Sequence, residues 1–336
     1  MLLLLLVSMV IGIAFGPTPL PPGRQLAILA QQFGLRHGAV TWRPDEAVIL
    51  LQVRMPRVMA GMLVGAALAT AGALLQGLLR NPLADPYLIG VSSGAGLGAT
   101  VAALFSPLAA RLAGFGLTSA RAFCCGLLTV LLVYRLARVG STVQVTPLLL
   151  AGVVVSSLFG AATTLLYTVS GQLSIRIREL FTWLAGGISV VGWTQLAVVG
   201  PIMGLGLAIA WTFARPLNAF ALGEEGAAYV GVHVQRQKLA IIAVSTLLTA
   251  FAVTLSGLIG FVGLVVPHAV RLLLGPNHRT LLPAAALGGA SFLVLADLGA
   301  RVALAPLELP VGIVTALLGG PFFLYLLQRS KRPHAL

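Results

Sequence analysis

One carboxylate in this sequence stands where it could bind a proton or an ion inside an apolar environment. Of the eight acidic residues, only Asp297 lies within an apolar run, and Arg301 follows it four residues later. Residues four apart meet on one face of a helix, so these two can form a local ion pair. Such a carboxylate is also typical of ion coupling, which leaves a secondary transporter coupled through Asp297 as an alternative hypothesis. A single acid supports that alternative weakly and points to an energy source in a partner.

Hydroxyl groups form the second set of side chains that could do chemistry. The apolar run at 147–169 carries Ser156, Ser157, Thr163, Thr164 and Thr168. These hydroxyls could line a polar pathway through an apolar bundle. Each could instead donate to the backbone carbonyl four residues earlier in its own helix, and the sequence leaves both roles open.

Motifs for catalysis or metal binding are absent from the sequence. A phosphate-binding loop needs Gly-Lys followed by Ser or Thr, and neither Lys238 nor Lys331 follows a glycine. There is no His-Glu-x-x-His motif, and the five histidines are far apart in the sequence. Cys124 and Cys125 are adjacent, which suits neither a disulfide nor a metal site. We therefore predict no catalytic residue, no metal site and no cofactor in this chain.

The composition defines the elements that must position these residues. The chain has 336 residues, of which 58% are hydrophobic and only 9% are charged, and its mean hydropathy is +1.01. A soluble domain carries roughly 25% charged residues, so lipid is the solvent that allows apolar side chains to face outward. The net charge of +13 comes from basic residues scattered singly between apolar runs, which argues against a nucleic-acid partner. The sequence predicts an all-α integral membrane protein with one domain over 1–336.

Apolar runs separated by polar breaks predict about ten transmembrane helices. They lie near 1–20, 58–79, 88–108, 117–135, 147–169, 191–214, 239–257, 259–274, 281–300 and 309–328. A polar stretch is expected over 21–57 and a short interfacial piece over 174–187. An even number of spans puts both termini on one side of the membrane.

The charge bias of the loops does not decide the orientation. The 21 basic residues divide into eleven on the side of the C-terminus and ten on the other, whereas the positive-inside rule needs a clear excess. Both lysines and the basic tail weakly favour a cytoplasmic C-terminus.

Small residues recur every four positions in three of the predicted spans. They are Gly61, Gly65, Ala69, Ala73 and Gly77, then Gly94 and Gly98, then Gly200 and Gly204. Small side chains let helices approach closely in lipid, so the spacing predicts tight helix packing.

Three polar stretches are out of character with the rest of the chain, and a fourth, apolar segment shares their family pattern. They are Arg-Met-Pro-Arg at 54–57, the segments Asn-Pro-Leu-Ala-Asp-Pro at 81–86 and Gly-Val-Ser-Ser-Gly-Ala-Gly at 90–96, the segment beginning Leu-Gly-Glu-Glu-Gly at 222–232, and the segment ending Val-Val-Pro-His at 257–268. Together they resemble the FecCD family of ABC importer permeases. The resemblance runs from Arg54 to Leu327 through Glu308-Leu309-Pro310 and Gly319-Gly320-Pro321, and departs at Asn277, where the family usually has an acid.

The resemblance implies a fold and a set of partners. Family members have ten helices with both termini cytoplasmic, in the bacterial inner membrane, and two copies form a central pathway. Two ATPase subunits, which bind ATP and magnesium, sit below, and a periplasmic substrate-binding protein docks above. The substrate implied is an iron complex (haem or ferric siderophore) or cobalamin.

The resemblance also implies roles for particular residues. Arg54, Arg57 and Arg301 fall on the outer face, where arginines in the family pair with acidic residues of the binding protein. The guanidinium fork suits carboxylates, and such docking would explain why the outer face is basic. Interfacial anchoring or local pairing, including Arg301 with Asp297, remains the alternative.

The loop at about 216–238 corresponds to the family's coupling helices, which sit in a cleft of the ATPase. Its motif residues are Leu222, Gly223, Glu224, Glu225, Ala227 and Gly231. Gly223 can break the preceding helix, the two glutamates suit a new helix N-terminus, and Gly226 and Gly231 should keep that helix short. An ordinary solvated connector is the alternative.

Overall fold

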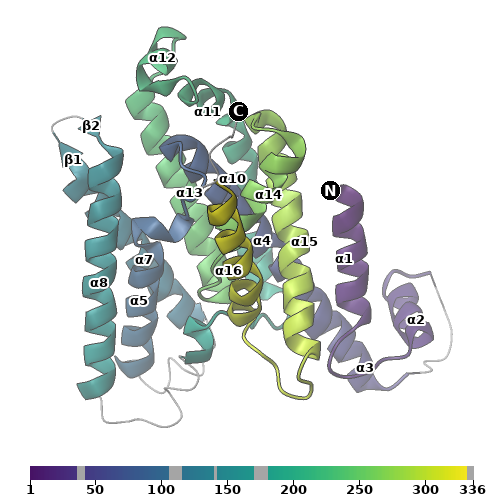
Figure 1. Ribbon diagram of the computed structural model, residues 1–336. Helices are drawn as coiled ribbons and strands as arrows, with labels where there is room; N and C mark the ends of the chain where they lie inside the picture. Colours follow the sequence, from purple (N-terminus) through teal and green to yellow (C-terminus); the bar gives the residue numbers. More distant parts are fainter. Residues whose placement is uncertain (36–41, 106–115, 140–141, 170–180, 331–336) are drawn as a thin grey trace.

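Helices make up nearly all the regular structure in the computed structural model, which describes residues 1–35, 42–105, 116–139, 142–169 and 181–330 (Figure 1). Among these residues, six helices are long and apolar enough to cross a membrane, and four shorter apolar helices accompany them. These ten agree with the ten predicted spans, so the prediction of an all-α membrane protein is confirmed.

The apolar helices follow one another in chain order, with short elements between them. They are α1 (Leu2–Ala14), α4 (Met55–Leu79), α5 (Val91–Phe105), α7 (Gly116–Ala137), α8 (Val145–Val169), α10 (Thr194–Thr212), α13 (Val234–Ser256), α14 (Val262–Leu274), α15 (His278–Val302) and α16 (Val311–Ser330). The connecting helices are α2 (Pro22–Gln32), α3 (Pro44–Val48), η1 (Ile49–Arg54), η2 (Pro86–Ile89), α11 (Ala214–Phe220) and α12 (Gly223–Tyr229). A small antiparallel hairpin pairs β1 (Arg138–Val139) with β2 (Thr142–Val143).

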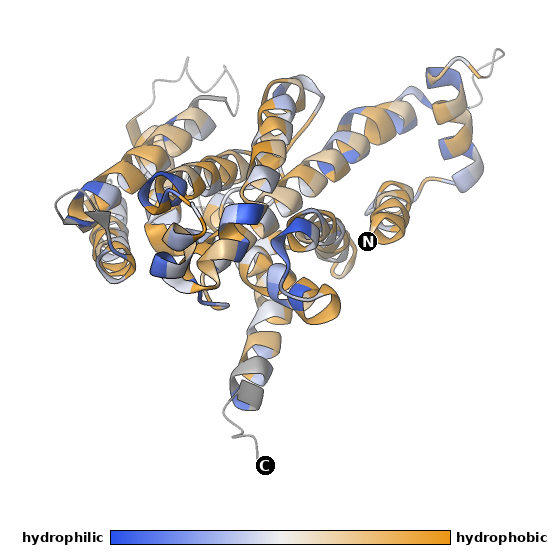
Figure 2. Ribbon diagram, turned by 90° about the horizontal axis from the view of Figure 1, so that it is seen from above, coloured by the Kyte–Doolittle hydropathy of each residue, from blue (hydrophilic) through white to orange (hydrophobic). Residues whose placement is uncertain are grey.

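The start of the chain differs from the prediction in two respects. α1 ends at Ala14 rather than near residue 20, because Pro17 disfavours helical backbone before it. The stretch expected to be a polar connection is largely helical, and α3 and η1 run into α4 as one continuous helix over Pro44–Leu79. The polar residues in this helix do not interrupt it, because Glu46 and Arg54 are buried and form hydrogen bonds inside the protein. From above, the α2–α3 segment lies to one side of the bundle (Figure 2).

The predicted interfacial piece at 174–187 is only partly within the described residues. Residues 181–184 form a helical turn, and the chain then runs without regular structure to Trp193. This irregular backbone is held inside the protein, because Gly187 N donates to Ser256 O (2.8 Å) and Gly312 N donates to Gly186 O (3.1 Å). Non-helical backbone in a membrane protein is tolerated only where neighbouring elements satisfy it in this way.

The buried core is centred on α4, which packs against α13, α14 and α15. A side chain at Gly65 would overlap Gly289 of α15, and one at Gly72 would overlap Gly263 of α14. The Gly65 contact confirms the predicted close packing through small residues, and Gly72, outside the predicted spacing, adds a second contact of the same kind. α10 differs, since a Cβ at Gly204 meets nothing within 4 Å and one at Gly200 meets only Leu63, at 3.6 Å. The spacing in α10 is therefore not a packing motif within this chain.

Hydrophobic residues predominate along the helices (Figure 2), and many of the large ones are exposed. On α8, Leu150, Leu158 and Leu165 are each more than 60% exposed. Water would not tolerate such a surface, whereas lipid or another apolar helix face would cover it.

Candidate functional site

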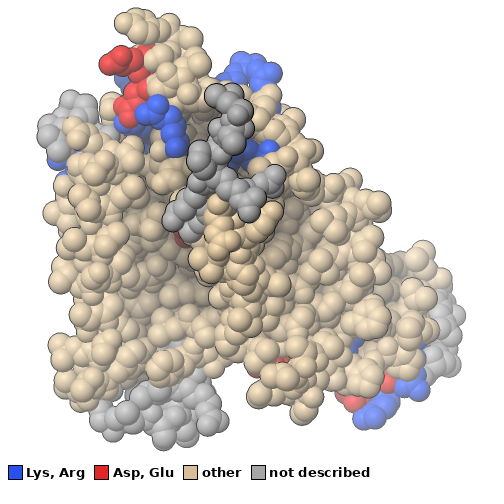
Figure 3. Space-filling view, in the orientation of Figure 1, with Lys and Arg blue, Asp and Glu red and all other residues tan. Residues whose placement is uncertain are grey.

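Charged side chains gather at two opposite ends of the bundle, with a largely uncharged band of surface between them (Figure 3). One end carries α11, α12 and the turn between α14 and α15, and we call it the α12 end. The opposite end holds α2, α3 and the last turn of α15, and we call it the Arg57 end. An apolar band between two polar ends is what a bilayer requires of a protein that spans it.

At the α12 end, the chain breaks and restarts a helix as the motif predicts. Gly223 begins α12 with φ +93°, a conformation that favours glycine. Glu224 and Glu225 occupy the first turn, where the helix dipole favours negative charge. The helix ends at Tyr229, before Gly231 with φ +85°. Gly226 was expected to help end the helix but lies in its middle. Gly231 is therefore the glycine that follows the helix end.

α12 is tied to the bundle on one side and exposed on the other. Lys238 of α13 contacts Glu224 Oε2 at 2.6 Å, and the Lys238 side chain is only 6% exposed. Leu222, Tyr229 and Val230 are 68%, 91% and 61% exposed. Exposed apolar side chains gathered on a short, anchored helix are typical of a protein–protein contact.

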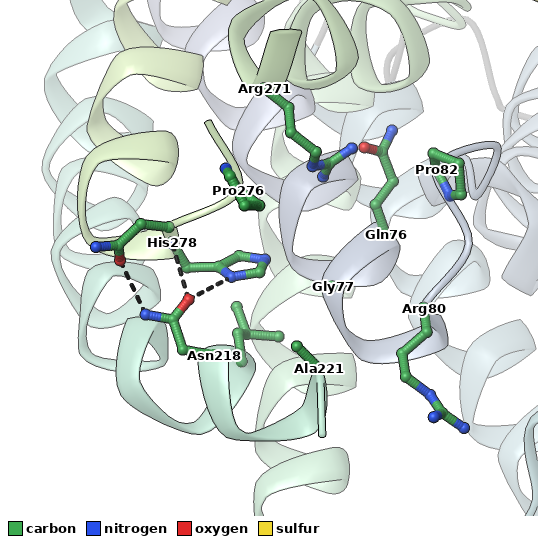
Figure 4. Close-up of a pocket in the computed structure, with 11 residues that line it drawn as sticks. Gln76, Gly77, Arg80, Pro82, Asn218, Ala221, Arg271, Pro276 and His278 are labelled. Carbon is green, nitrogen blue, oxygen red and sulfur yellow. Dashed lines mark hydrogen bonds between the residues drawn. The ribbon is translucent and has the colours of Figure 1, made fainter. Parts of the chain in front are cut away.

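A pocket of about 610 Å³ lies beside α11, whose Asn218 and Ala221 line it (Figure 4). Its lining brings together the end of α4, α11 and the α14–α15 turn, with Arg80 and Arg271 contributing positive charge. Asn218 of α11 joins two of these elements, because its Oδ1 accepts from His278 N (2.9 Å) and lies 2.8 Å from His278 Nδ1. α11 is thus fastened to the first residue of α15.

Asn277, where the family pattern usually has an acid, has a structural role. Its Oδ1 accepts from Arg279 N (3.1 Å) and caps the start of α15. The same oxygen accepts from Asn218 Nδ2 at 2.9 Å. A neutral amide therefore both starts α15 and holds α11.

At the Arg57 end, two acids and two arginines from distant parts of the chain form one network. Asp297 Oδ2 lies 2.9 Å from Arg301 Nε, which confirms the predicted local pair. Asp297 Oδ1 lies 3.0 Å from Arg57 Nη2, and Arg57 Nη1 lies 2.8 Å from Glu308 Oε2. Asp297 and Arg301 are each 2% exposed, while the Glu308 side chain is 43% exposed. Arg57 thus links a buried ion pair to the surface.

Two of the three arginines that were predicted to lie on the outer face bind the end of α1. The last carbonyls of a helix lack partners within it and carry its negative dipole end. Arg54 donates to the carbonyls of Ile13 (3.3 Å), Ala14 (3.2 Å) and Thr18, and Arg301 Nη2 donates to Gly12 O (3.2 Å). α1 has no basic residue in its own last turn, so guanidinium groups from two other helices cap it.

This arrangement bears on the docking prediction without testing it. Arg54 is 3% exposed and Arg301 2%, and both are bonded within this chain. The side chain of Arg57 is 14% exposed, beside the more accessible Glu308. Docking on these arginines stays a prediction, and in this conformation Arg57 is the one of the three nearest to the surface.

The hydroxyls of α8 are mostly bonded to their own helix. Ser157, Thr163, Thr164 and Thr168 each donate to the carbonyl four residues earlier, at 2.8–3.0 Å. Ser156 Oγ instead pairs with Ser93 Oγ of α5 at 3.2 Å. Ser157, Thr164 and Thr168 lie exposed, and a hydroxyl that donates to its helix keeps acceptor capacity. The pathway role of these residues stays a prediction.

Four polar residues have clear structural roles that the sequence did not assign to them. Gln76 Nε2 donates to Ala84 O (3.4 Å) and Leu264 O (3.2 Å), joining α4 to α14. In the sequence, Gln76 could have been recognised as the one amide side chain within its apolar run. Asp85 begins η2 by accepting from Tyr87 N (2.8 Å), and burial raises the pKa of its carboxyl to about 6. The other two, Asn218 and Glu308, lie in connections where sequence alone shows no partner.

The part of the chain that the structure describes contains no group of three His, Cys, Asp or Glu side chains placed to hold a metal. Cys124 and Cys125 are not joined to each other. The absence of a metal or cofactor in this chain stays a prediction.

Ten apolar helices among the described residues, with charged side chains gathered at two ends of the face in Figure 3, are the architecture of a multi-pass membrane protein. The chain belongs to the FecCD transport family, whose profile matches residues 4–329. It is 42% identical to the ABC transporter permease protein YvrB of Bacillus subtilis over 98% of this chain and 92% of the relative. It is 46% identical to the cobalamin import permease BtuC of Halobacterium salinarum (87% and 77% covered) and 42% identical to the hemin transport permease HmuU of Yersinia pestis (84% and 84%).

Solved structures share the fold. An inward-facing ABC transporter assigned to the metal-chelate type matches with a TM-score of 0.81 and 32% identity, covering 98% of this chain and 97% of the other. The PsaBC complex of Streptococcus pneumoniae with a Fab matches with a TM-score of 0.55 and 20% identity, covering 84% and 93%. At that identity the second match supports the fold alone.

This chain is therefore the permease subunit of an ABC importer, a class that works with ATPase and binding-protein partners and hydrolyses ATP in separate subunits. A secondary transporter coupled through Asp297 is not favoured. Both oxygens of that carboxylate are held by arginines, which leaves it poorly placed to exchange ions.

Proposed function

We propose that this permease imports an iron complex, either haem or a ferric siderophore, or cobalamin, delivered by a periplasmic binding protein. The observation that carries the proposal is the identity of 42–46% with permeases named for hemin and for cobalamin over more than four-fifths of this chain. Both named substrates are bulky metal complexes, which would require a wide pathway.

We place that pathway between two copies of the chain in the bacterial inner membrane. α8 supports this assignment, since most of its surface is exposed in the single chain and carries the accessible Ser157, Thr164 and Thr168. Hydroxyl acceptors scattered among apolar side chains would let a large ligand pass without holding it tightly.

The α12 end is the proposed contact with two ATPase subunits, which bind ATP and magnesium and lie on the cytoplasmic side with both termini. The exposed Leu222, Tyr229 and Val230 support this contact. Movement of α12 would reach α13 through Lys238, and movement of α11 would reach α15 through Asn218. This chain would perform no covalent chemistry of its own.

The Arg57 end is the proposed docking surface for the binding protein. Its arginines could pair with carboxylates of that partner, and complementary charge would set the docking register. The accessible edge of Arg57 supports a contact there.

The test is to purify the chain in mild detergent with its partners and reconstitute the complex in liposomes. We expect a stoichiometric subunit with a phosphate-binding loop, and ATP-dependent accumulation of one labelled compound among haem, a ferric siderophore and cyanocobalamin. Purification without an ATPase, repeated under crosslinking, would contradict the assembly. Accumulation of none of the three compounds by an active complex would contradict the substrate class.

A further inference from the structure

Arg57 uses its two edges for two different carboxylates. The inner edge faces the buried Asp297, with Nε 3.1 Å and Nη2 3.0 Å from Oδ1. On the outer edge, Nη1 lies 2.8 Å from Glu308 Oε2. Asp297 is 2% exposed and shared with Arg301, whereas the Glu308 side chain is 43% exposed. Only the outer carboxylate could be exchanged without opening the bundle.

The connection between α15 and α16 delivers Glu308 to this position. Leu309 N donates to Ala300 O (3.0 Å), which holds the residue after Glu308 against the last turn of α15. Leu307 N donates to Leu304 O (2.9 Å) and closes a tight turn before it. The backbone on both sides of Glu308 is thus bonded, so its carboxylate is presented to Arg57 at little entropic cost.

We propose that Glu308 is an internal competitor that occupies Arg57 and sets how tightly the binding protein docks. The inference rests on the docking surface proposed above. A carboxylate from another protein can reach the outer edge of Arg57 only by taking the place of Glu308. Docking therefore exchanges one ion pair for another, which lowers affinity and lets the partner leave after delivery.

The neighbouring arginines offer no equivalent position. Arg54 and Arg301 are at most 3% exposed and bonded to the end of α1. Exchanging their partners would uncap that helix. The Arg57–Glu308 pair is the accessible part of the network among the described residues, and a partly exposed pair contributes little to folding. Its loss should therefore change binding more than stability.

The experiment uses the permease–ATPase complex in nanodiscs and the binding protein that purifies with it. Glu308→Gln should bind that protein about two- to five-fold more tightly at low salt, the equivalent of one exposed ion pair. The difference should shrink at high salt.

Arg57→Gln alone should weaken binding. Adding Glu308→Gln to Arg57→Gln should not change the affinity further, because without Arg57 there is no guanidinium for Glu308 to pair with.

Asp45→Asn is the matched control. Asp45 lies at the same end and pairs with the exposed Arg43 at 2.9 Å, so its neutralisation changes the net charge equally without freeing Arg57. A gain of the same size in this control, or unchanged affinity in Glu308→Gln with a normal melting temperature, would overturn the inference. Absence of binding to the wild-type complex would instead refute the docking surface itself, and the inference with it.

Discussion

Arg54 and Arg301 show how buried guanidinium groups can replace a helix's own C-terminal cap. Each reaches carbonyls at the end of α1 from another helix, and a side chain at Gly16 would come within 2.9 Å of Arg54 Nε. The glycine thus leaves room for the guanidinium. Gln25 Nε2 also donates to Ala14 O (2.9 Å), but the positive charge at that end of α1 comes from the two guanidinium groups. These contacts should therefore contribute to stability.

We expect Arg54→Met to lower the free energy of unfolding by about 1–3 kcal/mol, since the carbonyls of Ile13 and Thr18 lose the donor that Arg54 supplies. Thermal unfolding in detergent would measure the change. Arg43→Met is the control, because its side chain is 75% exposed and an exposed pair contributes about 0–1 kcal/mol. Equal melting temperatures for the two variants would mean that the capping contacts are not stabilising.

Asp85 makes stability depend on pH in a direction opposite to that of most carboxylates. Burial raises its pKa from 3.8 to about 6, although the bond from Tyr87 N works against the shift. Between these values the folded protein keeps a proton that the unfolded chain has released, so stability falls as pH rises from about 4 to 6. Above pH 6 the cost is complete.

Asp85→Asn should therefore be more stable than wild type at pH 7.5, by about 1–3 kcal/mol. The amide oxygen can still accept from Tyr87 N. The advantage should disappear near pH 4. Melting temperatures at pH 4.5, 6 and 7.5 would measure it, and a difference that does not change with pH would show that the carboxyl is not protonated in the folded state.

At the scale of elements, glycines allow the backbone of α4 to pack directly against the backbones of α14 and α15. We expect Gly72→Ala to destabilise the protein by about 2 kcal/mol or more, because the new Cβ overlaps the Gly263 backbone, which cannot rotate away. The matched change Gly204→Ala meets nothing within 4 Å and should be neutral or stabilising by helix propensity. Folded yield and thermal unfolding would compare them, and equal tolerance would contradict the proposed α4–α14 contact.

At the scale of the whole molecule, substitutions on the exposed surface of α8 can show whether that surface lines a transport pathway or contacts lipid. Thr164→Trp should reduce transport at least about ten-fold if two copies enclose a pathway there, because bulk at a constriction blocks passage. The complex should still assemble and hydrolyse ATP. Leu158→Trp, on an apolar and 61% exposed position of the same helix, is the control. Equal transport by both variants would place Thr164 outside the pathway.

Much of the architecture followed from composition and local pattern. Low charge and long apolar runs required lipid as the solvent, and breaks between runs located most of the ten helices. Gly223 with its two following glutamates predicted the start of α12, and the spacing of Asp297 and Arg301 predicted their ion pair. These features depend on residues close together in the sequence, so sequence alone determined them.

Tertiary structure decided what depends on distant residues. Arg57 and Asp297 are 240 positions apart, and no local spacing connects them. The 21–57 stretch looked like a polar connection because sequence cannot show that Arg54 has carbonyl partners on α1. Gly65 and Gly204 both lie in a four-residue spacing of small residues, and only the approach of α15 separates a tight contact from an open face. The composition alone thus determined a membrane bundle, whereas the choice of partners for its few buried polar groups required the folded chain, since burial makes each of them costly to leave unpaired.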